Sequence, residues 1–156
     1  MKNGNKPEEK LIVSACLAGF PCRYDGKAQT DPEIEDLVKC GKAVPVCPEA
    51  LGGLPTPRVP CEIVGGSGED VLAGSARVIA FDGRIAFDCT DAFIKGARAA
   101  LKAAKDIGAA RSVLKANSPS CGFGTIYDGS FSGTRKPGSG VAAALLSQNG
   151  ITIESR

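Results

Sequence analysis

The chain of 156 residues contains no histidine, and that absence removes several kinds of active site. Ser-His-Asp triads, Cys-His nucleophile pairs and zinc sites with histidine ligands cannot be built from it. Any general acid or base must therefore be a carboxylate, a thiol, an amine or a phenol.

Long hydrophobic runs and blocks of like charge are missing as well. The apolar run at 11–13 is far too short for a signal peptide or a membrane span, so we expect a cytoplasmic protein without a membrane partner. The formal net charge is only +2, with no basic tail. Electrostatics therefore gives no support for nucleic acid as a partner.

The chain does contain seven cysteines. A disulfide framework is not expected in the reducing cytoplasm, and an odd number of cysteines in a chain of this size indicates metal or thiol chemistry for some of them. The 43% of apolar residues is typical of a globular protein. We expect a short disordered arm at 1–10 and a single domain at 11–156.

Alternating strand and helix signals predict an α/β protein. The expected strands lie at 11–14, 42–46, 111–115 and 151–153, with a hairpin at 76–87 around Asp82-Gly83. The expected helices lie at 31–40, 90–107 and 140–148. The Gly- and Pro-rich segment 48–60 is expected to have no regular structure, and 65–68 to be a turn. This pattern is typical of a three-layer domain with a mostly parallel sheet.

Three cysteines each follow a different predicted strand: Cys16, Cys47 and Cys121. Because the carboxyl ends of parallel strands meet at one edge of a sheet, we expect these thiols to face one crevice. Cys22 shares the first loop with Cys16 and is a possible fourth ligand. The other three cysteines are interpreted as structural: Cys40, Cys61 and Cys89.

The spacing of these cysteines favours an iron–sulfur cluster over a single metal ion. Structural zinc sites usually show C-x-x-C pairs, and ferredoxins show compact cysteine runs; neither occurs here. A cluster held by three cysteines would leave one iron open, as a Lewis-acid catalyst requires. With Cys22 as fourth ligand the cluster would be closed, and its role structural or electron-transferring.

Polar residues next to these cysteines are candidates for chemistry. Glu49, two residues after Cys47, is suited either to proton transfer or to capping backbone amides. The serines Ser118 and Ser120 precede Cys121 and are suited to proton relay, to binding a polar substrate or to a simple turn.

Further along the same loops lie candidate substrate-binding residues: Arg23, Tyr24, Arg58, Ser120 and Asn117. A guanidinium both stacks on a planar heterocycle and binds anions. Arg58 has the alternative of tying its own loop to a carboxylate.

Three long motifs resemble those of a known bacterial family. SACLAGFPCRYDG, CPEALGGLPTPRVP and LKANSPSCG, in this order, are similar to the motifs of the thiouracil desulfidase family. The resemblance implies a Rossmann-like α/β fold and a [4Fe–4S] cluster with one free iron. Its implied ligands are Cys16, Cys47 and Cys121. Cys22 also matches a family cysteine.

The resemblance further implies a non-redox reaction that converts a thiolated pyrimidine to uracil and sulfide. The thiocarbonyl sulfur would be held at the open iron, Glu49 would deprotonate the attacking water, and Ser118 would help to move a proton. Two other functions stay open from the sequence. One is desulfuration of thiouridine in tRNA, and the other is a structural metal-binding or sulfur-relay module that uses Cys22.

Overall fold

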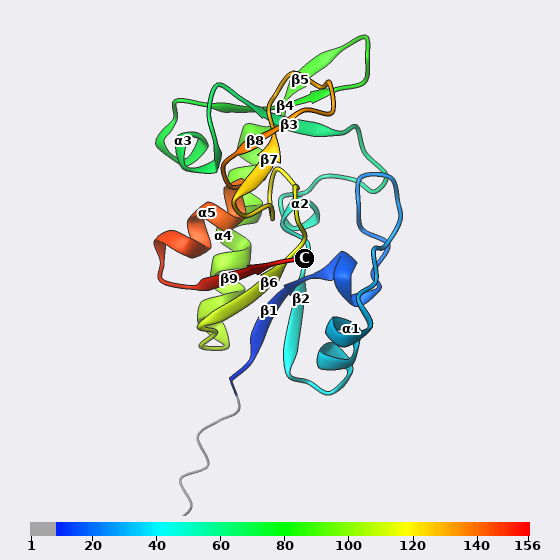
Figure 1. Cartoon of the computed structure of the whole chain (residues 1–156), viewed down its shortest axis with the longest axis vertical. Helices are drawn as coiled ribbons and strands as arrows, with labels where there is room; N and C mark the ends of the chain where they lie inside the picture. Colours follow the sequence, from blue (N-terminus) through cyan, green and yellow to red (C-terminus); the bar gives the residue numbers. More distant parts are fainter. Residues whose placement is uncertain (1–8) are drawn as a thin grey trace, which may run out of the picture.

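A four-stranded parallel sheet forms the centre of the fold (Figure 1). Across the sheet its strands are β2 (Ala43–Val46), β1 (Leu11–Ser14), β6 (Arg111–Leu114) and β9 (Thr152–Ser155). The computed structural model describes residues 9–156, so most of the predicted arm lies outside the described residues. The mostly parallel sheet and its strands are as predicted, within a few residues. The division into an arm and one domain stays a prediction.

Helices cover both faces of this sheet and complete the three predicted layers. They are α1 (Pro32–Lys39) on one face and α4 (Thr90–Asp106) and α5 (Val141–Gln148) on the other. Successive residues of a strand point to opposite faces. Ile12 packs in the cluster with α4 and α5, Val13 packs with Ile34 of α1, and both strand residues are fully buried. A strand buried on both faces is rich in consecutive apolar residues, here 11–13, which is why β1 was predictable.

The ends of these helices follow local side-chain chemistry. The Asp31 carboxylate accepts a hydrogen bond from the Glu33 amide, and Pro32 opens α1, as the sequence indicates. The helix expected at 90–107 is α4, and Thr90 is its first residue, not the residue that caps it. The Thr90 hydroxyl accepts from the Val78 amide of β4, so it ties the helix to the second sheet. No helix of the described residues is long and apolar enough to cross a membrane.

The segment 48–60 contains one helical turn, so the prediction of no regular structure is partly wrong. Helix α2 (Pro48–Leu51) begins directly after Cys47. Proline at the first helical position has the required φ and lacks only an N–H that would be unpaired anyway. That position favours a helix start, and the glycines that follow end it.

A second, antiparallel sheet lies beyond the carboxyl ends of the central one (Figure 1). It consists of β3 (Cys61–Val64), β4 (Arg77–Phe81) and β5 (Ala86–Asp88), and β4–β5 is the predicted hairpin. The sequence did not indicate β3, helix α3 (Gly68–Ala73) or the hairpin of β7 (Thr125–Tyr127) and β8 (Arg135–Pro137). The 3-10 turn η1 (Ala15–Ala18) also lies in a predicted loop. All of these elements are short and flanked by glycine or serine.

Candidate metal centre

A pocket of about 560 Å³ lies at the carboxyl ends of three neighbouring strands, β2, β1 and β6. From β1 the chain runs to β2 on one side, and it later returns to β6 on the other. Loops diverge at such a change in strand order, and α/β proteins bind their ligands there. Residues of the second sheet and of the β7–β8 hairpin line the pocket from the other direction.

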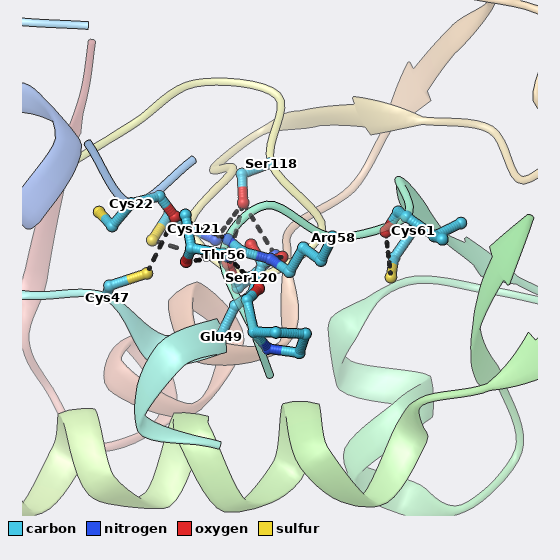
Figure 2. A network of polar contacts seen from close by, with 11 residues as sticks. Cys22, Cys47, Glu49, Thr56, Arg58, Cys61, Ser118, Ser120 and Cys121 are labelled. Atoms are coloured by element: carbon cyan, nitrogen blue, oxygen red, sulfur yellow. Dashed lines mark hydrogen bonds and ion pairs between the residues drawn. The ribbon is translucent and has the colours of Figure 1, made fainter. Parts of the chain in front are cut away.

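All four candidate cysteines line this pocket: Cys16, Cys22, Cys47 and Cys121. Cys16 lies in η1, Cys47 lies between β2 and α2, and Cys121 lies in the loop after β6. Figure 2 shows Cys22, Cys47 and Cys121 on the same side of the polar network, with Cys61 apart from them. Cys16 and Cys121 are buried, whereas Cys22 and Cys47 are partly accessible. The structure thus brings together the thiols that the sequence grouped.

Burial keeps most of these thiols protonated in the absence of a cation. It raises the pKa of Cys121 to about 12 and also raises that of Cys16. The pKa of Cys47 is instead lowered to about 6, because it accepts hydrogen bonds from the Cys22 thiol and the Ala50 amide. The pKa of Cys22 rises in consequence. Cys47 Sγ lies 3.7 Å from the carbonyl oxygen of Cys22. The thiol can donate a hydrogen bond to this oxygen when it is protonated.

This donor set fits a cluster better than a single ion. Thiolates on one zinc ion stand within about 4 Å of one another, because each Zn–S bond is about 2.3 Å long. The described residues contain no group of three or more His, Cys, Asp or Glu side chains arranged to hold one ion. Ligands of a cluster sit on separate iron atoms and stand farther apart. Metal binding would displace the protons of these buried thiols.

Lys115 is a pocket residue that the sequence analysis did not single out. It follows β6 directly, and its amide donates to the hydroxyl of the buried Ser14 at 2.9 Å. Burial lowers the pKa of its ammonium, while the thiolate forms of Cys16 and Cys121 raise it. A lysine at the end of a core strand, shortly before a cysteine loop, was the available signal.

The Glu49 carboxylate is held at both oxygens. Oε1 accepts from Arg58 Nε at 3.1 Å, and Oε2 accepts from Ser120 Oγ at 2.9 Å. The two charged side chains are largely buried, with 13% and 6% of their surfaces exposed. The sequence separation of Glu49 and Ser120 is 71 residues, so only the fold brings them together.

The guanidinium of Arg58 donates hydrogen bonds to other groups of the protein (Figure 2). Besides Glu49, it donates to the carbonyl of Cys22 at 2.9 Å, to the carbonyl of Pro55 at 3.2 Å and to the Thr56 hydroxyl at 3.1 Å. These contacts match the alternative in which Arg58 ties its own loop to a carboxylate. Arg58 thereby connects the first cysteine loop, the Pro-rich loop and helix α2.

The two candidate serines form one chain of hydroxyls with Glu49. Ser118 Oγ lies 2.9 Å from Ser120 Oγ, so Ser120 stands between Ser118 and the carboxylate. Ser118 Oγ also accepts from the amides of Ser120 and Cys121, each at 3.1 Å. Ser120 is 2% exposed, whereas Ser118 is more accessible. Both hydroxyls are therefore positioned for proton relay.

The loop that carries these serines is anchored on the start of α5. The amides of Val141 and Ala143 donate to the carbonyls of Pro119 and Ser120, at 2.9 and 3.0 Å. A Cβ at Gly122 would stand 2.5 Å from the Ser118 carbonyl oxygen, so only glycine fits this turn. The first turn of α5 thus holds the backbone of this loop in place.

The remaining predicted residues, Arg23, Tyr24 and Asn117, also line the pocket. Arg23 donates to the Gln29 side chain at 2.9 Å and stands over the Tyr24 ring, whose side chain is 44% exposed. Cys61, which we expected to be purely structural, lines the pocket too. So do three aromatic residues missed in the sequence: Phe81, Tyr127 and Phe131.

The fold and the pocket together define a Rossmann-like α/β protein with a cysteine-lined site at the carboxyl edge of its sheet. Residues 11–156 match the model of the 2-thiouracil desulfurase family, and the chain belongs to that family. The family predicted from the three motifs is thus confirmed.

Two individual proteins are closely similar. A solved structure described as "[4Fe-4S]-dependent thiouracil desulfidase TudS" is 41% identical, with a TM-score of 0.81, and the match covers 95% of this chain and 91% of that one. The "Uncharacterized protein YbbK" of Bacillus subtilis (strain 168) is 50% identical over 145 residues, which cover 93% of this chain and 94% of that protein.

Proposed function

We propose that this protein is a [4Fe–4S]-dependent desulfidase that converts a thiouracil-like pyrimidine to uracil and sulfide without net electron transfer. The observation that carries the proposal is the meeting of Cys16, Cys47 and Cys121 in one pocket with the hydrogen-bonded Glu49. The family and the solved structure are both named for thiouracil, so thiouridine in tRNA is the less favoured substrate.

Three cysteines would hold the cluster: Cys16, Cys47 and Cys121. When bound, the cluster would supply a soft iron site with a vacant position for the substrate's thiocarbonyl sulfur. Cys22 would lie beside the cluster rather than act as a ligand, with its carbonyl oxygen accepting from Arg58 and lying within reach of Cys47 Sγ. Lys115 would offset part of the negative charge that the thiolates bring.

Glu49 would be the general base that deprotonates the attacking water. Each carboxylate oxygen has two lone pairs, so an oxygen that accepts from Arg58 or Ser120 can still accept from water. Arg58 fixes the aim of the carboxylate by a buried ion pair. Because the carboxylate is already oriented, the reaction step does not have to include the entropy cost of orienting it.

Ser118 would deliver the proton to the substrate ring or the departing sulfur. Its path to Glu49 runs through Ser120, with 2.9 Å at each step between heavy atoms. The water proton taken by Glu49 thus returns by way of the two hydroxyls, and no proton is gained or lost overall. Arg23 and Tyr24 would contact the ring from the first loop.

The test is turnover of 2-thiouracil by anaerobically reconstituted protein, without any added electron donor. We expect uracil and sulfide in equal amounts, measured by chromatography and by methylene blue formation. Glu49→Gln should keep its iron and sulfide content and lose activity by about 100-fold or more. Glu69→Gln, an exposed carboxylate on α3, is the control and should be fully active. Dependence on a reductant, or normal activity of Glu49→Gln, would contradict the proposal.

A further inference from the structure

The loop between β7 and β8, residues 128–134, is fastened to β3 by a single carboxylate. Glu62 Oε1 accepts hydrogen bonds from the amide of Gly129 at 2.9 Å and from the amide of Phe131 at 3.2 Å. The sequence separations are 67 and 69 residues. A Gly- and Ser-rich loop is thereby held in one place by a partly buried side chain of the second sheet.

Backbone contact reinforces this attachment. Gly129 has a φ of 91°, and a Cβ there would stand 2.6 Å from the carbonyl oxygen of Ile63 in β3. Only glycine permits the two backbones to approach so closely. The position of the loop relative to the sheet is therefore fixed at Gly129, two residues before Phe131.

Phe131 itself adopts a backbone conformation that large side chains rarely take. Its φ is 57°, in the left-handed region. Its ring packs edge to face against Phe81 of β4, with centroids 5.3 Å apart and an interplanar angle of 66°. Strained residues of this kind persist where surrounding contacts hold them, and they cluster at functional sites.

Both of these rings line the cysteine pocket, together with Tyr127 of β7. Figure 1 shows the second sheet and the β7–β8 hairpin beyond the carboxyl ends of the central sheet. The four candidate cysteines and Glu49 thus come from the central sheet and its loops, and these three aromatic side chains come from the other side. None of the aromatic rings has a part in the proton transfers described above.

We propose that Phe131 is a specificity-determining residue that stacks on the planar ring of the substrate, and that Glu62 is the residue that positions it. The proposal rests on the proposed function, since it presumes a planar heterocycle in this pocket. A flat apolar face beside a thiocarbonyl site favours aromatic pyrimidines over saturated rings with the same polar groups.

The first test compares binding of uracil and 5,6-dihydrouracil by calorimetry on the reconstituted protein. The two share their hydrogen-bonding groups, but only uracil is planar. The wild type should prefer uracil, and Phe131→Ala or Phe131→Leu should reduce that preference by roughly 2- to 12-fold, as expected for one aromatic pair. Phe131→Tyr should restore it, and Phe87→Ala, an exposed phenylalanine on β5, should leave it unchanged.

Because neither compound carries sulfur, this experiment does not depend on turnover. A protein that fails to desulfurate 2-thiouracil but binds uracil with the expected preference would overturn the proposed function alone. An unchanged preference in Phe131→Ala, in active enzyme, would overturn the stacking alone. Absence of any preference in the wild type would overturn it as well.

The second test addresses Glu62. Hydrogen exchange at the amides of Gly129 and Phe131 should accelerate in Glu62→Ala, and the uracil preference should fall as in Phe131→Ala. Glu62→Gln keeps an acceptor oxygen. It should therefore retain most of the protection of the two amides and most of the uracil preference. Iron content should be unchanged in either variant, because the hydrogen bonds of Glu62 go to loop amides and not to the cysteines proposed as ligands. Fast exchange with an intact preference would show that Glu62 holds the loop without positioning the ring.

Discussion

At the scale of single residues, the site depends on a chain of hydrogen bonds in which each side chain is held by its neighbour. Glu49 has one oxygen on Arg58 and the other on Ser120, and Ser120 in turn contacts Ser118. Replacing any member leaves its neighbour with an unsatisfied, largely buried group, which costs more than the contact itself contributes. Effects of such substitutions are therefore not additive along the chain.

The two serines should differ in their effect on turnover. Ser118→Ala removes the hydroxyl at the accessible end of the relay, and we expect it to lower kcat by about 100-fold. Ser120→Ala removes the middle of the relay, where water can replace the buried hydroxyl, and should lower kcat by about 10-fold. Initial rates with 2-thiouracil measure both, and iron content checks that the cluster is kept. A larger loss in Ser120→Ala would show that Ser120 delivers the proton.

At the scale of secondary structure, a single helical turn carries Glu49. Helix α2 is too short to be stable alone and takes its place from packing against α4. Gly96 of α4 lies directly against the carbonyl of Pro48, and Gly52 lies against the carbonyl of Ala92, so neither position has room for a Cβ. The backbones of the two helices touch, and this contact sets the height of Glu49 above the sheet.

Gly96→Ala should therefore disturb the active site from a distance. The added methyl group collides with the Pro48 carbonyl, so α2 must shift, at a cost of about 1–3 kcal/mol in the free energy of unfolding. We expect thermal unfolding at a lower temperature and a fall of 10-fold or more in kcat, since small misplacements of a catalytic group are costly. Lys95→Ala, on the exposed face of α4, should show neither effect.

At the scale of the whole molecule, the sequence predicts the central layers well and the second sheet poorly. The first three residues of the strand Leu11–Ser14 are all apolar because the strand is buried on both faces, and that pattern is visible without a structure. β3 and the β7–β8 hairpin are held by distant partners, such as the contact of Glu62 with Gly129. No local pattern records such a contact, so these elements could not be predicted.

The same distinction applies to the site. The cysteines were grouped correctly because each follows a strand of one parallel sheet, and strand ends meet by geometry alone. The partners of Arg58 could only be posed as alternatives, and the aromatic side of the pocket was missed. Phe131 depends on an unusual φ and on contacts with another sheet, and neither leaves a signal in its own segment.

The central claim is that Cys16, Cys47 and Cys121 hold a [4Fe–4S] cluster. Cys22 is not a ligand in this account, so one iron stays open. Iron and acid-labile sulfide analysis of single-cysteine variants, reconstituted without oxygen, tests it most directly. Wild type, Cys22→Ala and the exposed control Cys40→Ala should each bind about four irons and four sulfides per chain. Each of the substitutions Cys16→Ser, Cys47→Ser and Cys121→Ser should abolish stable cluster binding. A Cys22→Ala protein without iron, or a full cluster in any of the three serine variants, would contradict the account.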